Sequence, residues 1–232
     1  MSRDAILGRI RASLGANASD GRGAAVAARI ADPPRNLVPS RADKEHSELV
    51  RQFVGYLQGQ AATVFQLDSA AQVPSAVAGY LRAAGLPPRL RLGDDAYLSA
   101  LDWASEAVLQ LERGRAEPDD VIGLSMALAG VSETGTLILA SGPQNPVTLA
   151  FLPETHIIVV PESGIVGCYE DAFDLVRSRF GNGRMPRTLN LVSGPSRTAD
   201  IGGRIVIGAH GPRHLCVVVV RGGSAHHPRP GP

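Results

Sequence analysis

Three short polar segments, each lying between apolar segments, carry the residue types that could do chemistry in this chain. They are "GVSETGT" (130–136), "SGPSRTAD" (193–200) and "GAHGPRHL" (208–215). Their hydroxyl, carboxylate, guanidinium and imidazole groups can bind anions or transfer protons. Open α/β sheets bind ligands beyond the ends of their strands, so we expect the three segments to meet as polar corners at one edge of a sheet. The alternative is that each segment only forms a turn between two strands.

The first segment contains the one carboxylate of special interest, Glu133. A turn between two strands would place Glu133, Thr134 and Thr136 at the end of a sheet, with Glu133 as the candidate catalytic residue and Thr134, Gly135 and Thr136 as candidate ligand-binding residues. In the other interpretation Ser132 caps the turn, Gly135 supplies a positive φ angle, and Glu133 is solvated.

The second segment combines a tight bend with an arginine. Gly194 and Pro195 predict the bend, and a serine or threonine hydroxyl after it can cap a following helical turn, whose free N–H groups would bind an anion. Arg197 can then bind a carboxylate or a phosphate through two hydrogen bonds. Alternatively, Arg197 pairs with Asp200 as a local contact worth a few tenths of a kcal/mol. The candidate ligand-binding residues are Ser193, Gly194, Ser196, Arg197, Thr198 and Asp200.

The third segment places an imidazole in a glycine-rich loop. His210 is followed by Gly211, which permits the close approach of a ligand, and Arg213 follows a rigid proline. We therefore add His210, Gly211 and Arg213 to the candidate ligand-binding residues, although a single loop histidine often has only a structural role. The six histidines are scattered and form no helical H-x-x-x-H pair, so the sequence predicts no metal site.

The elements that must position these segments alternate between strands and helices. Several of the strands are continuous β-branched segments, which is typical of strands buried on both faces of a parallel or mixed sheet. The sequence therefore predicts an α/β fold, with an open mixed or mostly parallel sheet and helices on both faces. The expected strands are 62–67, 89–92, 136–141, 155–161, 188–193, 204–208 and 214–220, and the expected helices are 41–58, 69–84, 94–102 and 168–180. The segments 107–113 and 119–131 follow the third of these helices and are left without an assigned element.

The two ends of the chain differ from its centre. Residues 3–14 have the spacing of an amphipathic helix, and residues 15–40, rich in Gly, Ala, Asp and Pro, predict a largely extended arm. We therefore expect an N-terminal helix and arm over 1–40, an α/β domain over 41–221, and a disordered tail over 222–232. The N-terminal arm is also the part that could reach a second protomer, so a homo-oligomer is one expectation.

Composition excludes several classes of protein. The chain has 232 residues, a formal net charge of +1, and no basic cluster interleaved with aromatic residues, so nucleic acid is not an expected partner. Its apolar segments are too short to cross a bilayer and its start does not have the pattern of a secretory signal, so we expect a cytoplasmic protein without membrane contact. Two cysteines cannot ligate a four-cysteine iron–sulfur cluster, and we expect no cofactor in this chain.

Four motifs in order resemble one known family. "SETGT" (132–136), "LPETHIIVV" (152–160), "SGPSRTADI" (193–201) and "GAHGPR" (208–213) resemble the lactate-utilisation protein C family, which carries the LUD domain, and the opening "SRDAILGRIRASLG" is similar to that family's N-terminus. The resemblance covers most of the chain. It implies a fold of the group formed by NagB, RpiA and the CoA transferases, an open α/β sheet with helices on both faces.

The same resemblance implies a function. In that family the C protein acts with two iron–sulfur partners, the A- and B-type subunits, in the oxidation of L-lactate to pyruvate. This chain would then be an accessory or substrate-binding subunit, with Arg197 and Arg213 holding a small carboxylate and with any redox centre in a partner. In the alternative, the chain is itself a CoA-transferase-like or sugar-phosphate-type enzyme, because "SETG" is similar to the "SENG" of CoA transferases, which would make Glu133 the acyl acceptor.

Overall fold

The computed structural model describes residues 2–13 and 21–222. The chain divides into two compact units, Met1–Asn36 and Leu37–Pro232. The predicted tail, 222–232, lies outside the described residues except for its first glycine.

The first unit contains two helices, α1 (Arg3–Ser13) and α2 (Arg22–Ala31), and no residue of either helix is buried. The predicted extended arm, 15–40, is therefore wrong over the length of α2. The segment "RGAAVAARIA" is rich in alanine, the strongest helix former, and that preference outweighs the neighbouring glycines. The helix ends just before Pro33, because proline disfavours helical geometry in the residue that precedes it.

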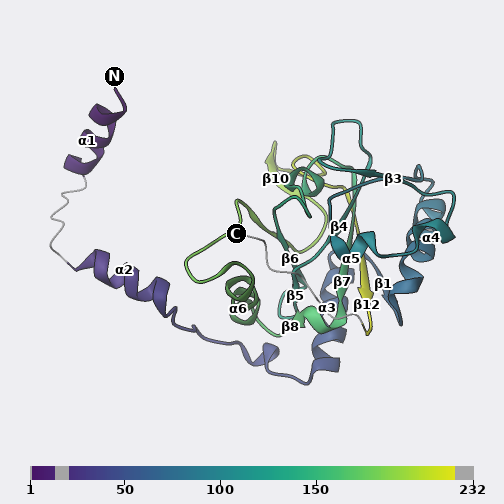
Figure 1. Ribbon diagram of the computed structural model, residues 1–232, viewed down its shortest axis with the longest axis horizontal. Helices are drawn as coiled ribbons and strands as arrows, with labels where there is room; N and C mark the ends of the chain where they lie inside the picture. The colour runs from purple at the N-terminus through teal and green to yellow at the C-terminus, as the bar shows by residue number, and fades with distance from the viewer. Residues whose placement is uncertain (1, 14–20, 223–232) are drawn as a thin grey trace. The chain divides into compact units, whose positions relative to one another are not determined.

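The second unit is built around a six-stranded sheet in which all neighbouring strands are parallel (Figure 1). This confirms the predicted α/β fold with a mostly parallel sheet. The strand order is β1-β12-β7-β4-β2-β3. The bounds are Thr63–Leu67 for β1, Arg89–Leu92 for β2, Gln110–Arg113 for β3, Ile122–Met126 for β4, Thr155–Pro161 for β7 and His214–Val220 for β12.

Helices cover both faces of this sheet, as predicted. Alternate residues of a strand point to opposite faces, so Val218 packs in the hydrophobic cluster that contains α4 (Val73–Ala83), whereas Val217 packs in the cluster that contains α3 (His46–Gly59). The short helix α5 (Ala96–Ser99) belongs to the α4 side through the buried Leu98. The parallel strands are thus buried on both faces, which is why their sequences are continuously apolar.

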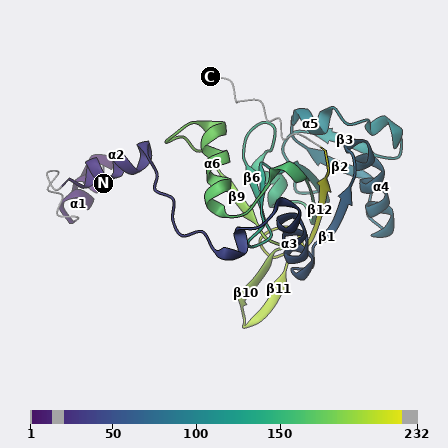
Figure 2. The same ribbon diagram turned by 90° about the horizontal axis from the view of Figure 1, so that it is seen from below.

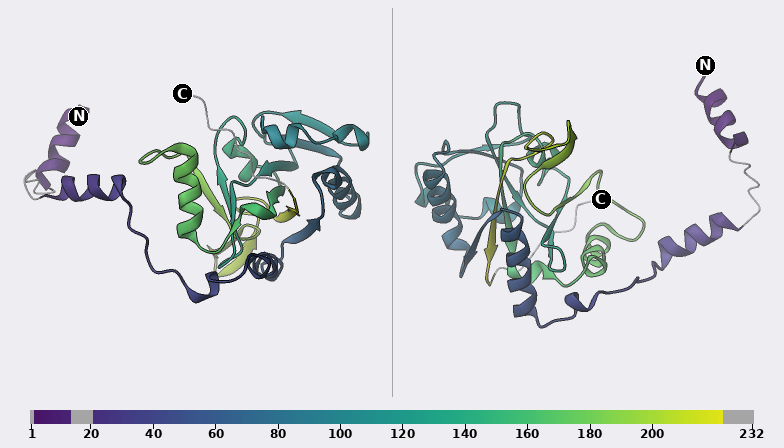
Figure 3. Two further views of the ribbon diagram at one scale, coloured as in Figure 1. Left: turned by 60° about the horizontal axis from the view of Figure 1, so that its bottom comes forward. Right: turned by 180° about the vertical axis from the view of Figure 1, so that it is seen from behind.

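A second sheet of four strands was not predicted as a separate sheet. Its order is β8-β5-β6-β9, and α6 (Tyr169–Phe180) packs against it through Ala172 and Val176 (Figure 3). The apolar strand β6 is buried on both sides, so its pattern resembles that of the parallel strands and gives no signal that it belongs elsewhere. The bounds are Ala129–Val131 for β5, Thr136–Ala140 for β6, Ile165–Val166 for β8 and Leu189–Val192 for β9.

An exposed hairpin forms from β10 (Arg197–Ile201) and β11 (Arg204–Ile207) and projects from the rest of the unit in Figure 2. The helical turn predicted after the bend at Gly194 is therefore wrong, because this segment is a strand. The two residues between the strands, Gly202 and Gly203, both have positive φ angles, which is the geometry of the tightest hairpin turns. That glycine pair between two strand-like segments is the signal that favours a hairpin over a helix.

Short 3-10 helices complete the described structure, and within residues 2–13 and 21–222 no helix is both long and apolar enough to cross a membrane. The 3-10 helices are η1 (Ser40–Ala42), η2 (Ala70–Gln72), η3 (Trp103–Ser105), η4 (Val147–Ala150) and η5 (Glu162–Gly164).

Candidate functional site

Glu133, the predicted catalytic residue, is buried and held by protein groups on both carboxylate oxygens. Its Oε1 accepts a hydrogen bond of 3.1 Å from the backbone N–H of Tyr169, the first residue of α6, and its Oε2 lies 3.5 Å from Nη2 of Arg41. A carboxylate at the start of a helix satisfies a free N–H group and interacts favourably with the helix dipole. Glu133 is therefore not solvated, and its contacts favour a role in anchoring α6 over that of an acyl acceptor.

The neighbours of Glu133 fix the turn to helix α3. The hydroxyl of Ser132 donates to the carbonyl of Leu49 at 2.7 Å and accepts from the amide of Gln52 at 3.0 Å. Gly135 has a φ of +65°, and a Cβ atom added there would lie 2.6 Å from Cβ of Tyr56. The predicted positive φ at Gly135 is confirmed, and the close approach of α3 adds a second requirement for glycine.

Four hydroxyl groups connect the first polar segment to the second. The hydroxyl of Thr136 lies 2.7 Å from that of Thr134, 2.8 Å from that of Tyr169 and 2.7 Å from that of Ser193. Each hydroxyl can both donate and accept, so the group forms one continuous network. The structure thus brings Thr134, Thr136 and Ser193 together as the prediction requires, and Tyr169 is a member that the sequence did not reveal.

The second and third polar segments meet at the base of the exposed hairpin. The backbone N–H of Ser196 donates to the carbonyl of Pro212 at 2.8 Å, and the N–H of Gly208 donates to the carbonyl of Ser196 at 2.9 Å. Thr198 lies opposite Val206 in the hairpin. Both segments are therefore organised by backbone hydrogen bonds of the hairpin, as the turn interpretation expects.

The two arginines predicted to hold a carboxylate both contact protein groups near the surface. Arg197 donates to the carbonyl of Gln60 at 3.1 Å, next to Gly194, and Arg213 pairs with Glu154 at 3.3 Å with about half of each side chain exposed. Arg213 precedes β12, so it lies at the amino end of a parallel strand, whereas ligands of open α/β sheets bind at the carboxyl ends.

The remaining predicted ligand-binding residues are His210, Gly211 and Asp200. His210 is exposed, and Gly211 lies close to Ser196, since a Cβ atom added at Gly211 would be 3.5 Å from Cβ of Ser196. The side chain of Asp200 lies outside the described part of the chain, so its pairing with Arg197 stays a prediction.

A cavity at the carboxyl edge of the parallel sheet lies outside all three predicted segments. It has a volume of about 200 Å³, and we call it the edge pocket. The residues that follow β2 and β4, the end of β6 and its following loop, and the last turn of α6 all contribute to it. Its lining residues are Asp95, Met126, Leu128, Ala140, Ser141, Gly142, Pro143, Gln144, Asn145, Arg179 and Phe180.

The loop over the edge pocket is held by backbone contacts. Gly142 and Asn145 exchange two backbone hydrogen bonds, at 3.2 and 3.1 Å, and the N–H of Asp94 donates to the carbonyl of Pro143 at 3.0 Å. A Cβ atom added at Gly93 would overlap the carbonyl oxygen of Gln144, so only glycine permits this approach. The wall of the edge pocket is thereby preformed, as is usual for small-molecule sites.

Two charged residues of opposite sign line the edge pocket. Asp95 is buried and caps α5, with its Oδ1 accepting from the N–H of Leu98 at 3.0 Å. Nη1 of Arg179 is a buried atom without a hydrogen-bond partner among the described residues, and the guanidinium lies 5.7 Å from the ring centre of Phe180. Burial lowers the pKa of Arg179, while the charge of Asp95 acts in the opposite direction. An arginine keeps its charge even so.

Signals for the edge pocket in the sequence are weak. Asp95 follows a predicted strand and precedes a short helix, which is the position of an ordinary N-cap. Arg179 is a basic residue in the last turn of a helix, where cations are common because they complement the helix dipole. Neither position indicates a ligand-binding site in the sequence. Only the fold brings Asp95 and Arg179 to the same cavity.

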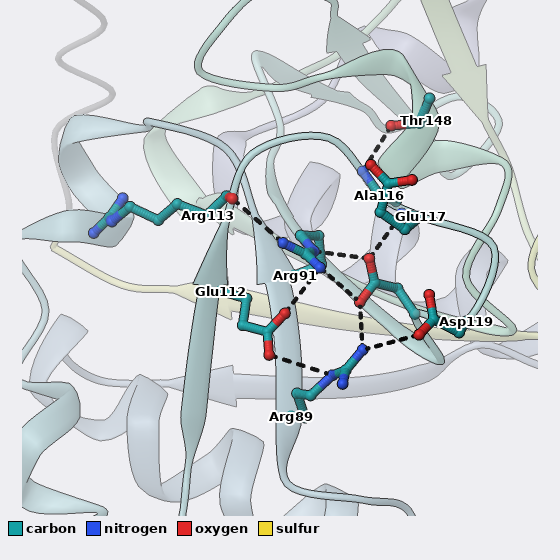
Figure 4. Close-up of polar contacts among 9 residues, drawn as sticks. Arg89, Arg91, Glu112, Arg113, Ala116, Glu117, Asp119 and Thr148 are labelled. Atoms are coloured by element: carbon teal, nitrogen blue, oxygen red, sulfur yellow. Dashed lines mark hydrogen bonds and ion pairs between the residues drawn. The ribbon is translucent and has the colours of Figure 1, made fainter.

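A cluster of arginines and carboxylates lies around β2 and β3 (Figure 4). Asp120 accepts from Nε of Arg91 at 2.7 Å and from Nη2 of Arg89 at 3.2 Å, and Glu112 lies 2.8 Å from Nη2 of Arg91. Burial acts to raise the pKa of Asp120, but hydrogen bonds from Arg91, the N–H of Glu117 and Arg89 outweigh it, so the pKa lies below its ordinary value. We call these residues the β2 network.

Metal ligands and reactive thiols do not gather in the described residues. In those residues no group of three or more His, Cys, Asp and Glu side chains could hold a metal ion. Both cysteines are buried, and burial raises the pKa of Cys216 to about 12. His156 is fully buried beside the hydroxyl of Ser125 at 2.9 Å, and burial lowers its pKa to about 3, so this imidazole stays neutral.

The chain is similar in sequence to a known family and to curated relatives. A family model described as the LUD domain matches residues 50–220. A lactate utilization protein C from Shouchella clausii is 36% identical over 99 residues, which are 43% of this chain and 43% of that protein, and the one from Bacillus subtilis is 34% identical over 100 residues, 43% and 42% respectively. The match thus spans less than half of each curated relative.

A solved structure supports the fold. The crystal structure of a DUF162 family protein from Deinococcus radiodurans is 28% identical in sequence and superposes with a TM-score of 0.58. The superposition covers 76% of this chain and 99% of that one.

Proposed function

Because the chain belongs to the LUD domain family, we propose that it serves L-lactate utilisation as a subunit without its own redox centre. The observation that carries this proposal is the identity of 36% and 34% with two proteins named lactate utilization protein C. The family model spans residues 50–220, the region that contains the three sheets and the edge pocket. The proposal therefore concerns this α/β unit.

Oxidation of L-lactate to pyruvate releases two electrons, which need an acceptor. The two cysteines of this chain cannot build a four-cysteine cluster, and both are buried in different elements. In our proposal the electrons therefore pass to A- and B-type partner subunits that hold iron–sulfur clusters. This chain contributes substrate binding or assembly.

Growth on a single carbon source tests the lactate role. We expect a strain without this chain to lose growth on L-lactate, to keep growth on pyruvate, and to recover when the full-length chain is restored. Pyruvate is the matched control because it enters metabolism after the proposed step. Undiminished growth of the deletion strain on L-lactate would contradict the proposal.

Co-purification tests the partner part separately. We expect the tagged full-length chain, isolated from lactate-grown cells, to bring down subunits that contain iron and acid-labile sulfide in comparable amounts. A chain that purifies alone under these conditions, from cells that require it for growth on lactate, would contradict the partnership and leave the lactate role standing.

A further inference from the structure

The edge pocket contains a partly buried arginine, Arg179, with one buried nitrogen that no described residue accepts a hydrogen bond from. Within the described residues, Nη1 of Arg179 has no hydrogen-bond partner, and Asp95, which lines the same cavity, acts on the guanidinium only through its charge. Leaving a buried donor unsatisfied is costly, and more so when the donor is charged. An acceptor, and best an anionic one, would satisfy this donor.

We propose that the edge pocket binds a small hydroxycarboxylate, whose carboxylate pairs with Arg179 and whose hydroxyl donates to Asp95. A guanidinium is the side chain best suited to hold a carboxylate, because it can donate two parallel hydrogen bonds. The choice of lactate as the test ligand rests on the proposed function. The anion site itself rests on the geometry of the edge pocket.

The requirement for a hydroxyl comes from Asp95. Its Oδ1 accepts from Leu98 N–H, while its Oδ2 accepts no hydrogen bond from the described residues. An ionised carboxylate can only accept, so a ligand group next to Oδ2 must be a donor.

The size of the edge pocket limits the ligand. The cavity volume of about 200 Å³ is several times the roughly 10–15 Å³ that one water molecule needs, so a small organic molecule fits. A three-carbon hydroxy acid has about that size.

The position of the edge pocket agrees with general rules for this kind of fold. Asp95 follows β2, and Met126 is the last residue of β4, which places the cavity at the carboxyl ends of neighbouring parallel strands. Ligands of open α/β sheets bind at that edge. The side chain amides of Gln144 and Asn145 also line the cavity and can bind a carboxylate oxygen or a hydroxyl.

Titration of the full-length chain with sodium L-lactate, followed by NMR, tests the proposal. We expect saturable binding that weakens at least tenfold in Arg179→Gln, in line with the loss of a hydrogen bond to a charged group. The control is Arg177→Gln, two residues away on α6, because Arg177 pairs with Asp174 instead. Equal affinity in Arg179→Gln and Arg177→Gln would overturn the proposal.

Three further measurements keep the test independent of folding. Arg179→Lys keeps the charge but loses the paired hydrogen bonds, so we expect intermediate affinity with an unchanged melting temperature. Propionate, which lacks the hydroxyl, should bind the wild-type chain at least tenfold more weakly than lactate. In Asp95→Asn, which keeps an oxygen to cap α5, that preference should shrink. Equal binding of propionate and lactate by the wild type would overturn the role of Asp95.

The failure of this inference can be told apart from failure of the proposed function. If the wild-type chain binds neither lactate nor propionate while the deletion strain fails to grow on lactate, the edge pocket is not the site and the lactate role stands. If the chain binds lactate through Arg179 while the deletion strain grows normally, the site stands and the lactate role falls.

Discussion

The β2 network and the edge pocket both contain arginines that are partly removed from solvent, but they differ in what those arginines contact. In the β2 network, Asp120 accepts hydrogen bonds from Arg89 and Arg91, and Glu112 forms ion pairs with both arginines (Figure 4). In the edge pocket, Nη1 of Arg179 contacts no acceptor among the described residues. An arginine whose donors are satisfied by its own chain stabilises the fold, whereas one that lacks an acceptor indicates a binding site.

The largest expected effect on the free energy of unfolding comes from a substitution that breaks the β2 network. Replacing Asp120 by alanine leaves two guanidinium groups without their shared, buried acceptor, so we expect a loss of about 2–4 kcal/mol in the free energy of unfolding. The lower part of that range reflects the partial exposure of Arg89. Urea unfolding measures the loss. Asp119→Ala is the control, because its side chain is 82% exposed and the change should cost less than about 0.5 kcal/mol.

Acid should remove the same stabilisation. The folded-state pKa of Asp120 lies below its ordinary value, so its contribution is fully present above the unfolded pKa of about 4 and is lost as the pH falls through the folded value. We therefore expect the stability difference between wild type and Asp120→Ala to be constant from pH 7 to 5 and to narrow below about pH 4. A difference that is independent of pH down to 2 would show that Asp120 does not act as an anion.

A smaller effect on the free energy of unfolding is expected at Glu133, whose carboxylate accepts hydrogen bonds from Tyr169 N–H and Arg41. Glu133→Ala removes the acceptor for the first N–H of α6, which should cost about 1–2 kcal/mol, as loss of a helix cap does. Incubation of the wild type with acyl-CoA compounds and borohydride should leave Glu133 unmodified. Modification of Glu133 would instead support the CoA-transferase alternative and contradict its structural role.

The smallest expected effect on stability is at Arg179. Because Nη1 has no acceptor to lose, Arg179→Met should change the free energy of unfolding by less than about 0.5 kcal/mol, or increase it, since it removes an unsatisfied buried donor. Differential scanning calorimetry in the absence of carboxylates measures this. A loss comparable to that of Asp120→Ala would remove the difference between the two arginine sites.

The two arginine sites also show what the sequence can predict. The alternation of β-branched strands with helices was sufficient for the parallel sheet and for helices on both faces. The four-stranded sheet was missed as a separate sheet because its buried strand β6 (Thr136–Ala140) has the same pattern as the parallel strands. Helix α2 (Arg22–Ala31) was missed because glycines and prolines around it outweighed its alanines in the interpretation.

The candidate site was predicted less completely than the fold. The turn at Gly135 and the meeting of Thr136 with Ser193 followed from polar segments between strands. Arg179 could not be distinguished from Arg177 in "VRSRFG", because the difference between them is which carboxylates lie nearby in space. Arg177 pairs with Asp174 three residues before it, whereas the cavity beside Arg179 is formed by segments far apart in the sequence, here a helix end and the residues after β2 (Arg89–Leu92).

The most direct test of the account follows the arginine side chains during binding. We would label the full-length chain with ¹⁵N-arginine, assign the side-chain signal of Arg179 with Arg179→Gln, and titrate with L-lactate. We expect the Arg179 signal to shift with saturation while those of Arg197 and Arg213 stay in place. Saturable shifts of Arg197 or Arg213 with an unmoved Arg179 would contradict it and place the carboxylate at the hairpin instead.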